Sequence, residues 1–296
     1  MQLYAALCAW DGKTSAQKLS PEQKRVQRIT GALRYPEKTT PAITLLLHRL
    51  SCVAACAPPS ANLVASLALE LAWEHRYDGL TFGLADDREL SSLLHGHVQL
   101  DERPPQRLDA TSDATWGAGI PDDVSIADLP PLASLAEHTA DGSELVARDL
   151  YSQVITFNGA AVLHSVRKIG VLLDSSMGVE AHGTAKVAEN NATARDTAHA
   201  LGAPQDGPTR IGTDNLANMQ VAMRRGAAGR SRHLLRRYYV LRQRIRDGEC
   251  QVTHVPDAEN PSDFLTKWVP ADKLRKSLAY VCGMAPVGGK KQRKQP

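Results

Sequence analysis

The chain has 296 residues, of which 43% are hydrophobic and 23% are charged, a composition that is typical of a folded globular protein and excludes a disordered tail. Its formal net charge of +3 conceals a strongly basic stretch at residues 224–246. The five cysteines are scattered and odd in number, which argues against a disulfide framework and a structural zinc site. The scattered cysteines favour a reduced intracellular compartment, cytoplasmic or nuclear. No apolar run approaches the length of a membrane span, so we expect no membrane partner.

The first element that the residues predict is a short strand at 108–114. Two consecutive prolines mark a linker before it, and two glycines favour turns behind it. Asp113 therefore lies at a strand end. Farther along, Asn158-Gly159 separates two apolar runs, and this pair of residues favours a type I′ hairpin turn. The sequence thus predicts an antiparallel pair of strands after the first strand.

A long helix is predicted for residues 180–201. Alanines recur there at helical spacing, and Gly202 provides a C-terminal stop. Glu180 opens this helix, so its carboxylate can be directed toward a neighbouring strand. Glu189 is a rival acid, but it lies about two and a half turns farther along and would point away from the strand ends.

Two more acids follow strand-like segments. Residues 209–213 are a strand candidate that ends at Asp214, and residues 216–225 have a helical pattern. Asp214 therefore occupies a strand-to-helix junction, a place that ligands favour in α/β sheets. Asp263 comes after a strand-like run at 250–255 and a turn, and it begins another short helix.

The candidate catalytic and metal-binding residues are Asp113, Glu180, Asp214 and Asp263. Hard divalent cations prefer oxygen ligands, and a phosphodiester held by such cations can be cut by a positioned water without a protein nucleophile. The four carboxylates in this order and context therefore suggest a metal-dependent nuclease.

The basic stretch at residues 224–246 contains nine arginines and no acid before Asp247. This density favours contacts with nucleic-acid phosphates, whereas the alternative is a solvated surface helix. His254 is a candidate proton donor, although an ordinary strand histidine is the favoured interpretation. The candidate nucleic-acid-binding residues are Arg225, Arg230, Arg232, His233, Arg236, Asn215 and Lys267.

Four short segments carry a specific resemblance. They are Ser-Asp-Ala-Thr-Trp at 112–116, Ser-Ser-Met-Gly-Val-Glu at 175–180, Asp-Asn at 214–215 and Asn-Pro-Ser-Asp-Phe-Leu-Thr-Lys at 260–267. Together they are similar to the ribonuclease H domain of copia-type LTR retrotransposon Pol polyproteins, and the last segment is the most specific. The resemblance implies a ribonuclease H-like mixed five-stranded sheet with flanking helices over residues 108–280.

The resemblance also implies an activity, which is hydrolysis of the RNA strand of RNA–DNA hybrids with two Mg²⁺ ions, for which Mn²⁺ is a possible substitute. Asp113, Glu180 and Asp214 would bind one ion, and Asp113 with Asp263 would bind the second, about 3.5–4 Å away. Contacts to 2′-hydroxyls would select RNA, while the arginine-rich segment would hold the DNA phosphates.

Upstream, the chain resembles the helical segment that joins the polymerase and ribonuclease H parts of copia polyproteins, through residues 29–35, 38–41, 50–52 and 79–83. We therefore expect a mostly helical connection or thumb-like segment over residues 1–103, and a basic tail at 286–296. No Tyr-x-Asp-Asp motif is present, so this would be a C-terminal Pol fragment without a polymerase active site. Its expected partner is an upstream polymerase domain or a sister Pol fragment.

Two departures from the family pattern bear on activity. Residues 118–147 are expected to form a loop insertion, and Gly178 replaces the first of the family's two glutamates. All four expected metal ligands are nevertheless present, which argues against advanced decay. The alternative function is a catalytically inactive nucleic-acid-binding remnant whose cleft the insertion blocks. Integrase-like or resolvase-like cutting on the same scaffold is a third, less favoured interpretation.

Overall fold

The computed structural model describes residues 20–53, 59–77, 79–80, 82, 107–116, 149–170, 173, 175–223 and 235–283. The chain divides into two compact units, one with residues 1–78, 115–150 and 166–174, and one with residues 79–114, 151–165 and 175–296. All four candidate acids belong to the second unit. The expected insertion at 118–147 and the expected tail at 286–296 lie outside the described residues.

The amino-terminal helices are α2 (Pro21–Leu33), α3 (Thr44–Val53) and α4 (Pro59–Glu74), with short 3-10 turns η1 (Pro36–Lys38) and η2 (Pro41–Ile43) between the first two. Helix α2 begins at Pro21 because Ser20 and Gln23 form a capping box. The buried faces of the three helices share an apolar core that includes Val26, Leu47 and Val64. A helical segment therefore precedes the sheet, as the sequence predicts.

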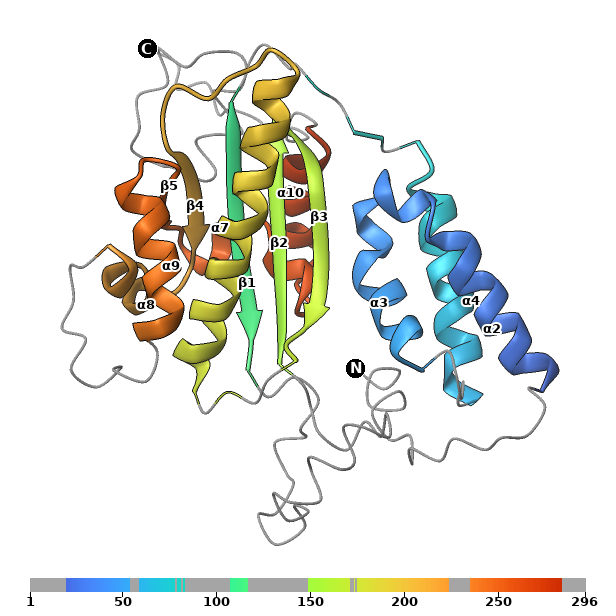
Figure 1. Ribbon diagram of the computed structural model, residues 1–296. Helices are drawn as coiled ribbons and strands as arrows, with labels where there is room; N and C mark the ends of the chain where they lie inside the picture. The colour runs from blue at the N-terminus through green and yellow to red at the C-terminus, as the bar shows by residue number, and fades with distance from the viewer. Residues whose placement is uncertain are drawn as a thin grey trace, which may run out of the picture. The chain divides into compact units, whose positions relative to one another are not determined.

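The sheet has five strands, β1 (Leu108–Thr115), β2 (Leu150–Phe157), β3 (Ala160–Lys168), β4 (Thr209–Thr213) and β5 (Cys250–His254), in the spatial order β3-β2-β1-β4-β5 (Figure 1). Strands β1 and β4 are parallel, with Asp109 opposite Arg210, and β4 and β5 are parallel as well. The side chains of Ser152 and Thr156 bond the carbonyls of Asp113 and Asp109, so β2 runs against β1.

The hairpin between β2 and β3 turns at Asn158 and Gly159, whose φ angles are 53° and 85°. Positive φ at both central residues is the property of a type I′ turn, so the predicted hairpin is confirmed. The sheet is therefore mixed. Strand β2 is antiparallel to β1, whereas β1, β4 and β5 are parallel to one another. This strand order with these directions is the ribonuclease H-like fold.

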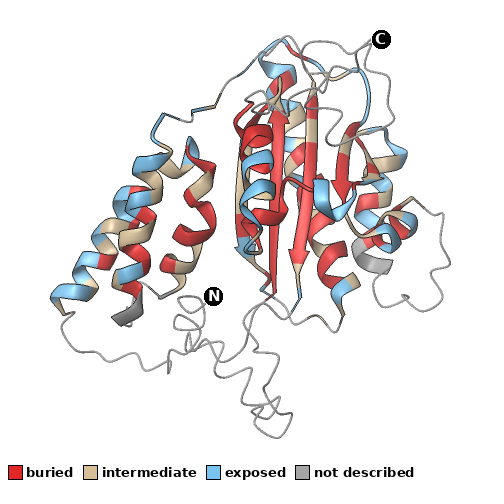
Figure 2. Cartoon of the chain, turned by 180° about the vertical axis from the view of Figure 1, so that it is seen from behind, coloured by how far each residue is buried: buried red, intermediate tan, exposed pale blue. Residues whose placement is uncertain are grey.

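Helices cover both faces of the sheet. Helix α7 (Ser176–Ala200) lies across the front in Figure 1, and α10 (Ala271–Cys282) lies behind. Helices α8 (Leu216–Ala222) and α9 (Leu235–Arg246) join α7 in a core around Ile211, Tyr238 and Val252. Figure 2 shows the central strands as mostly buried. No described helix combines the length and the apolar character that a membrane-spanning segment needs.

Two predicted helix boundaries are wrong by about one turn. Helix α7 begins at Ser176 rather than Glu180, because the Ser175 side chain caps it by accepting from the Gly178 backbone N–H. Helix α8 ends at Ala222, where Met223 forms the C-cap, rather than at residue 225. Because α7 starts early, Glu180 lies within the helix, with helical residues both before and after it.

Candidate metal centre

Asp113 lies near the end of the central strand, where its side chain is fully buried. Its Oδ2 accepts a short hydrogen bond from the Thr266 hydroxyl, and its Oδ1 lies 3.3 Å from the Nζ of Lys267. Burial raises the pKa of Asp113, the nearby ammonium of Lys267 opposes this, and the charges of Asp263 and Asp214 reinforce it. A buried carboxylate so close to others needs cations to stay ionised.

Glu180 approaches Asp113 from helix α7. The helix can come this close because Gly183 faces the sheet, where an added Cβ would stand only 3.3 Å from the Tyr151 Cβ. Burial, followed by the charges of Asp113 and Asp214, raises the Glu180 pKa to about 9. Its Oε2 is buried and finds no hydrogen-bond partner among the residues that the structure describes. A buried carboxylate oxygen without a partner is costly, which marks a place for a cation.

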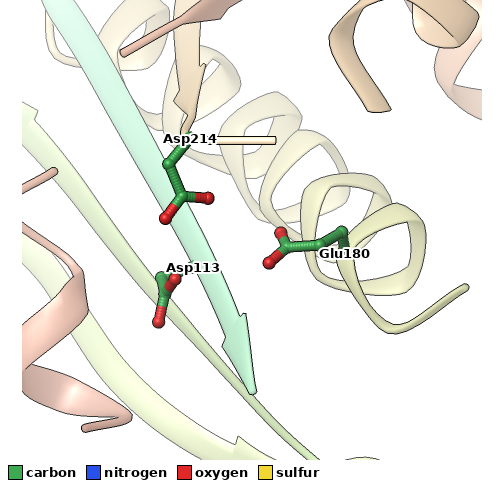
Figure 3. A group of neighbouring side chains, drawn as sticks. All are labelled: Asp113, Glu180 and Asp214. Atoms are coloured by element: carbon green, nitrogen blue, oxygen red, sulfur yellow. The ribbon is translucent and has the colours of Figure 1, made fainter. Parts of the chain in front are cut away.

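Asp214 follows directly after strand β4, at the junction that the sequence predicts. Each of Asp113, Glu180 and Asp214 offers one carboxylate oxygen, and these three atoms lie within 4.8 Å of one another. Figure 3 shows the three carboxylates turned toward a common point, from β1, α7 and the end of β4. Burial is also the main cause of the raised Asp214 pKa. Three segments far apart in sequence thus form one acidic cluster.

The cluster fits a hard divalent cation. Such ions take carboxylate oxygens as ligands, and the three oxygens are close enough to share one ion. The unpartnered Oε2 of Glu180 and the raised pKa values of the acids are what a missing positive charge would leave behind. The residues present therefore suit a hard divalent metal ion.

Asp263 lies beside this cluster, at the start of the 3-10 turn η6 (Asp263–Leu265), and it is buried. Its Oδ1 is 2.7 Å from the Nζ of Lys267, and its Oδ2 pairs with Lys273. Asp214, Asp257 and Asp263 form a second group whose ligand atoms also lie within 4.8 Å. Asp113 and Asp263 were expected to bind a second ion, and the structure places the Lys267 ammonium between them.

Asp257 was missed by sequence reasoning, which treated residues 256–261 only as a turn. It begins the 3-10 turn η5 (Asp257–Glu259), its side chain is largely exposed, and its Oδ2 is 3.5 Å from the Nζ of Lys273. A turn that directly follows a strand at the same sheet edge as Asp214 could have been recognised as a source of ligands.

A set of hydrogen bonds ties the loop that carries Asp263 to the central strands. The Asn260 side chain donates to the Ser112 carbonyl at 3.1 Å and accepts from the Ser262 backbone N–H, also at 3.1 Å. The Ser152 hydroxyl donates to the Ser262 carbonyl at 3.0 Å. Asp263 is thus positioned by hydrogen bonds that Asn260 and Ser262, in the same segment, make with β1 and β2.

Most of the expected nucleic-acid-binding side chains lie outside the described residues, namely Arg225, Arg230, Arg232 and His233, and also the side chain of Arg236, whose backbone belongs to α9. Asn215 caps α8 by accepting from the Asn218 backbone N–H at 2.9 Å. Other arginines of the basic stretch bind the protein itself, since Arg242 donates to the Val221 carbonyl and Arg244 pairs with Glu249. The side chains of Arg242 and Arg244 therefore stabilise the fold.

His254 is exposed at the end of β5, and its Nε2 lies 3.1 Å from the backbone carbonyl oxygen of Asp214. This contact holds the ring beside the junction that carries Asp214. It agrees with the favoured interpretation of His254 as a strand histidine with an ordinary partner.

Neither a protein-family model nor a curated protein sequence matches the chain. Among solved structures, the chain is similar to the N-terminal RNase H domain of a protein from Mycobacterium tuberculosis, solved as a fusion with maltose-binding protein. The identity is 16%, the TM-score is 0.32, and the alignment covers 54% of this chain and 91% of the other. The fold assignment rests on the strand order and directions of the sheet itself.

Proposed function

We propose that this chain is a divalent-cation-dependent ribonuclease H that hydrolyses the RNA strand of RNA–DNA hybrids, as part of a copia-type retrotransposon Pol protein. The observation that carries the proposal is the convergence of Asp113, Glu180 and Asp214 on one point of a ribonuclease H-like sheet. The sequence motifs around these acids support the retrotransposon assignment.

In this proposal Asp113, Glu180 and Asp214 hold a Mg²⁺ ion, with Mn²⁺ as a possible substitute. When bound, such an ion lowers the pKa of a water molecule and stabilises negative charge on a phosphodiester. The chain orients the ligands for it, because the Thr266 hydroxyl fixes one oxygen of Asp113 and the Asn260 side chain donates to the carbonyl of Ser112, the residue before Asp113. Asp214 is only partly buried, so the cluster opens to solvent on its side.

Lys267 neutralises part of the negative charge on Asp113 and Asp263, and it does so without being withdrawn from solvent, since 38% of its side chain is exposed. A substrate phosphate brings further negative charge to the same edge of the sheet. The ammonium therefore lowers the repulsion that a polyanion would meet at four clustered acids.

A cleavage assay tests the proposal. The substrate is an RNA–DNA hybrid with a labelled RNA strand in Mg²⁺, beside duplex DNA and duplex RNA. We expect cutting of the hybrid alone, and Glu180→Gln should reduce the rate by a hundredfold or more, which corresponds to about 3 kcal/mol of barrier. Glu189→Gln is the matched control, because Glu189 lies on the same helix but is exposed and pairs with Lys186 at 2.7 Å.

Two outcomes would contradict this function. Metal-dependent cutting of duplex DNA in preference to the hybrid would favour the integrase-like or resolvase-like interpretation. Binding of the hybrid without metal-dependent cutting would favour the inactive remnant.

A further inference from the structure

Two lysines occupy both oxygens of Asp263. The Nζ of Lys267 lies 2.7 Å from Asp263 Oδ1, and the Nζ of Lys273 pairs with Asp263 Oδ2. The carboxylate is almost fully buried, with 4% of its side chain exposed, and Lys273 is itself mostly buried, with 14% exposed. A carboxylate buried in this way is neutralised by protein charges, because its oxygens face ammonium groups.

Lys267 also reaches the first acidic cluster. The same Nζ lies 3.3 Å from Asp113 Oδ1, so one ammonium bridges Asp113 and Asp263. The backbone places Lys267 one turn after Asp263, since the Lys267 N–H donates to the Asp263 carbonyl at 2.9 Å. The ammonium itself is held by the two carboxylates, which it contacts from this position.

A metal ion and an ammonium cannot share this place. Both would use the facing oxygens of Asp113 and Asp263, and two cations within about 4 Å repel each other strongly at the effective dielectric of a partly buried site. By contrast, the oxygen of Glu180 that lacks a partner among the described residues lies in the other group, with Asp113 and Asp214. In the second group, of Asp214, Asp257 and Asp263, the Lys273 ammonium already lies beside Asp257 and Asp263. Among the described residues, the unmet demand for a cation is therefore in the first group.

The charges agree with this division. Asp113, Glu180, Asp214 and Asp263 carry four negative charges when all are ionised, while the charge of Asp257, whose side chain is 72% exposed, is screened by solvent. The ammonium groups of Lys267 and Lys273 provide two positive charges, and a single divalent ion provides the other two. A second divalent ion would leave an excess of positive charge in a site that excludes much of the solvent.

We propose that Lys267 serves as the built-in second cation of this centre, so that the protein binds one divalent ion, at Asp113, Glu180 and Asp214, while the Lys267 ammonium bridges Asp113 and Asp263. This inference rests on the proposed function for its catalytic meaning, and it concerns how many ions the centre holds. Lys267 is thus a positioning and charge-neutralising residue.

The test is a Mn²⁺ titration of the full chain, with bound Mn²⁺ counted by electron paramagnetic resonance and by calorimetry. We expect one bound ion in the wild type. Lys267→Met removes the ammonium but keeps much of the side-chain volume, and it should raise the count to two, because Asp113 and Asp263 are then free to take an ion. Lys267→Arg keeps the charge and should bind one ion. Lys186→Met, at an exposed pair with Glu189, is the surface control and should also bind one.

Melting of the same proteins in a chelator, and again in Mn²⁺, gives a second measurement. Without metal, Lys267→Met should melt below the wild type, because it leaves the buried Asp113 and Asp263 with fewer cationic partners. Mn²⁺ should raise its melting temperature by more than it raises that of the wild type. A Lys267→Met protein that fails to fold in chelator but folds in Mn²⁺ would support the inference in the same way.

Two bound ions in the wild type would overturn the inference, as would a count of one that Lys267→Met leaves unchanged. Wild type that binds no Mn²⁺ would overturn both the metal centre and the role of Lys267. One bound ion, a second in Lys267→Met and no cutting of the hybrid would reject the nuclease function while the role of Lys267 stands.

Discussion

The side-chain amide of Asn260 donates a hydrogen bond of 3.1 Å to the backbone carbonyl of Ser112, the residue directly before Asp113. The two residues are far apart in sequence, and Asn260 is almost fully buried. This bond holds the loop that carries Asp263 against the strand that carries Asp113. The geometry of the acidic centre therefore depends on a residue that carries no charge.

Asn260→Ala is expected to lower the free energy of unfolding by about 2–3 kcal/mol, because two buried hydrogen bonds are lost and their backbone partners stay buried. Chemical denaturation in chelator measures the change. Asn190→Ala is the comparison, since Asn190 makes a side-chain bond of 2.7 Å to Gln153 at a partly exposed position and should cost less. An equal loss in both variants would contradict the role given to Asn260.

The metal-free protein should lose stability as the pH rises. The Glu180 pKa is raised from its usual 4.5 to about 9, so the folded state binds this proton more tightly than the unfolded chain does. The resulting stability is fully present below pH 4.5 and is lost as the pH rises toward 9. Melting in chelator at several pH values measures it, and Glu180→Gln should show a flatter profile. Added Mg²⁺ should stabilise more at high pH, because ligation needs the ionised carboxylates; the opposite trend would argue against a shared cation.

Gly212→Ala should be strongly destabilising. Gly212 lies on β4, two residues before Asp214, and an added Cβ would stand 2.7 Å from the Val255 Cγ2 and 3.3 Å from the Thr111 Cγ2. Overpacking of this kind costs about 1–3 kcal/mol. Gly207→Ala is the matched control, because nothing lies within 4 Å of its added Cβ. Denaturation midpoints compare the two, and a Gly212→Ala protein as stable as the control would mean that Val255 and Thr111 do not pack this closely on Gly212.

Tyr238→Phe tests a buried polar network behind the acids. The Tyr238 hydroxyl donates to Asn218 Oδ1 at 2.7 Å, and the Asn218 amide donates to the Thr184 hydroxyl at 2.8 Å. Removing the hydroxyl leaves the Asn218 oxygen without this donor, which should cost about 1–3 kcal/mol. Tyr239→Phe is the control, because Tyr239 is 71% exposed. Equal unfolding free energies for the two variants would remove this network as a source of stability.

Local sequence signals predicted much of the fold. Strand β4 has the predicted bounds, and Asn158-Gly159 forms the predicted turn, because both depend on residues that are adjacent in the chain. The convergence of Asp113, Glu180 and Asp214 agrees with the motif-based expectation. The predicted helix ends were less accurate. The start of α7 was placed at Glu180 because the capping role of Ser175 was not recognised.

Pairings between distant residues could not be predicted in the same way. Lys267 was expected to contact nucleic acid, and the structure pairs it with Asp113 across 154 positions of the chain. Nothing in the composition of either segment specifies that contact, because it follows from how the loop after β5 packs against β1. The part of Asp257 in a second acidic group was missed for the same reason.

The central strand β1 is synthesised well before one of the strands that it pairs with. Strand β1 lies in the middle of the sheet, but one of its two neighbours, β4, is synthesised long after it, with Asp109 paired to Arg210. While the ribosome is still translating the residues between β3 and β4, strands β1 to β3 can form an antiparallel sheet. The side of β1 that later pairs with β4 is then unpaired and can bind other chains. The acidic centre is complete only when the loop with Asp263 has emerged, so a nascent chain released earlier would lack Asp263 and would be prone to aggregate.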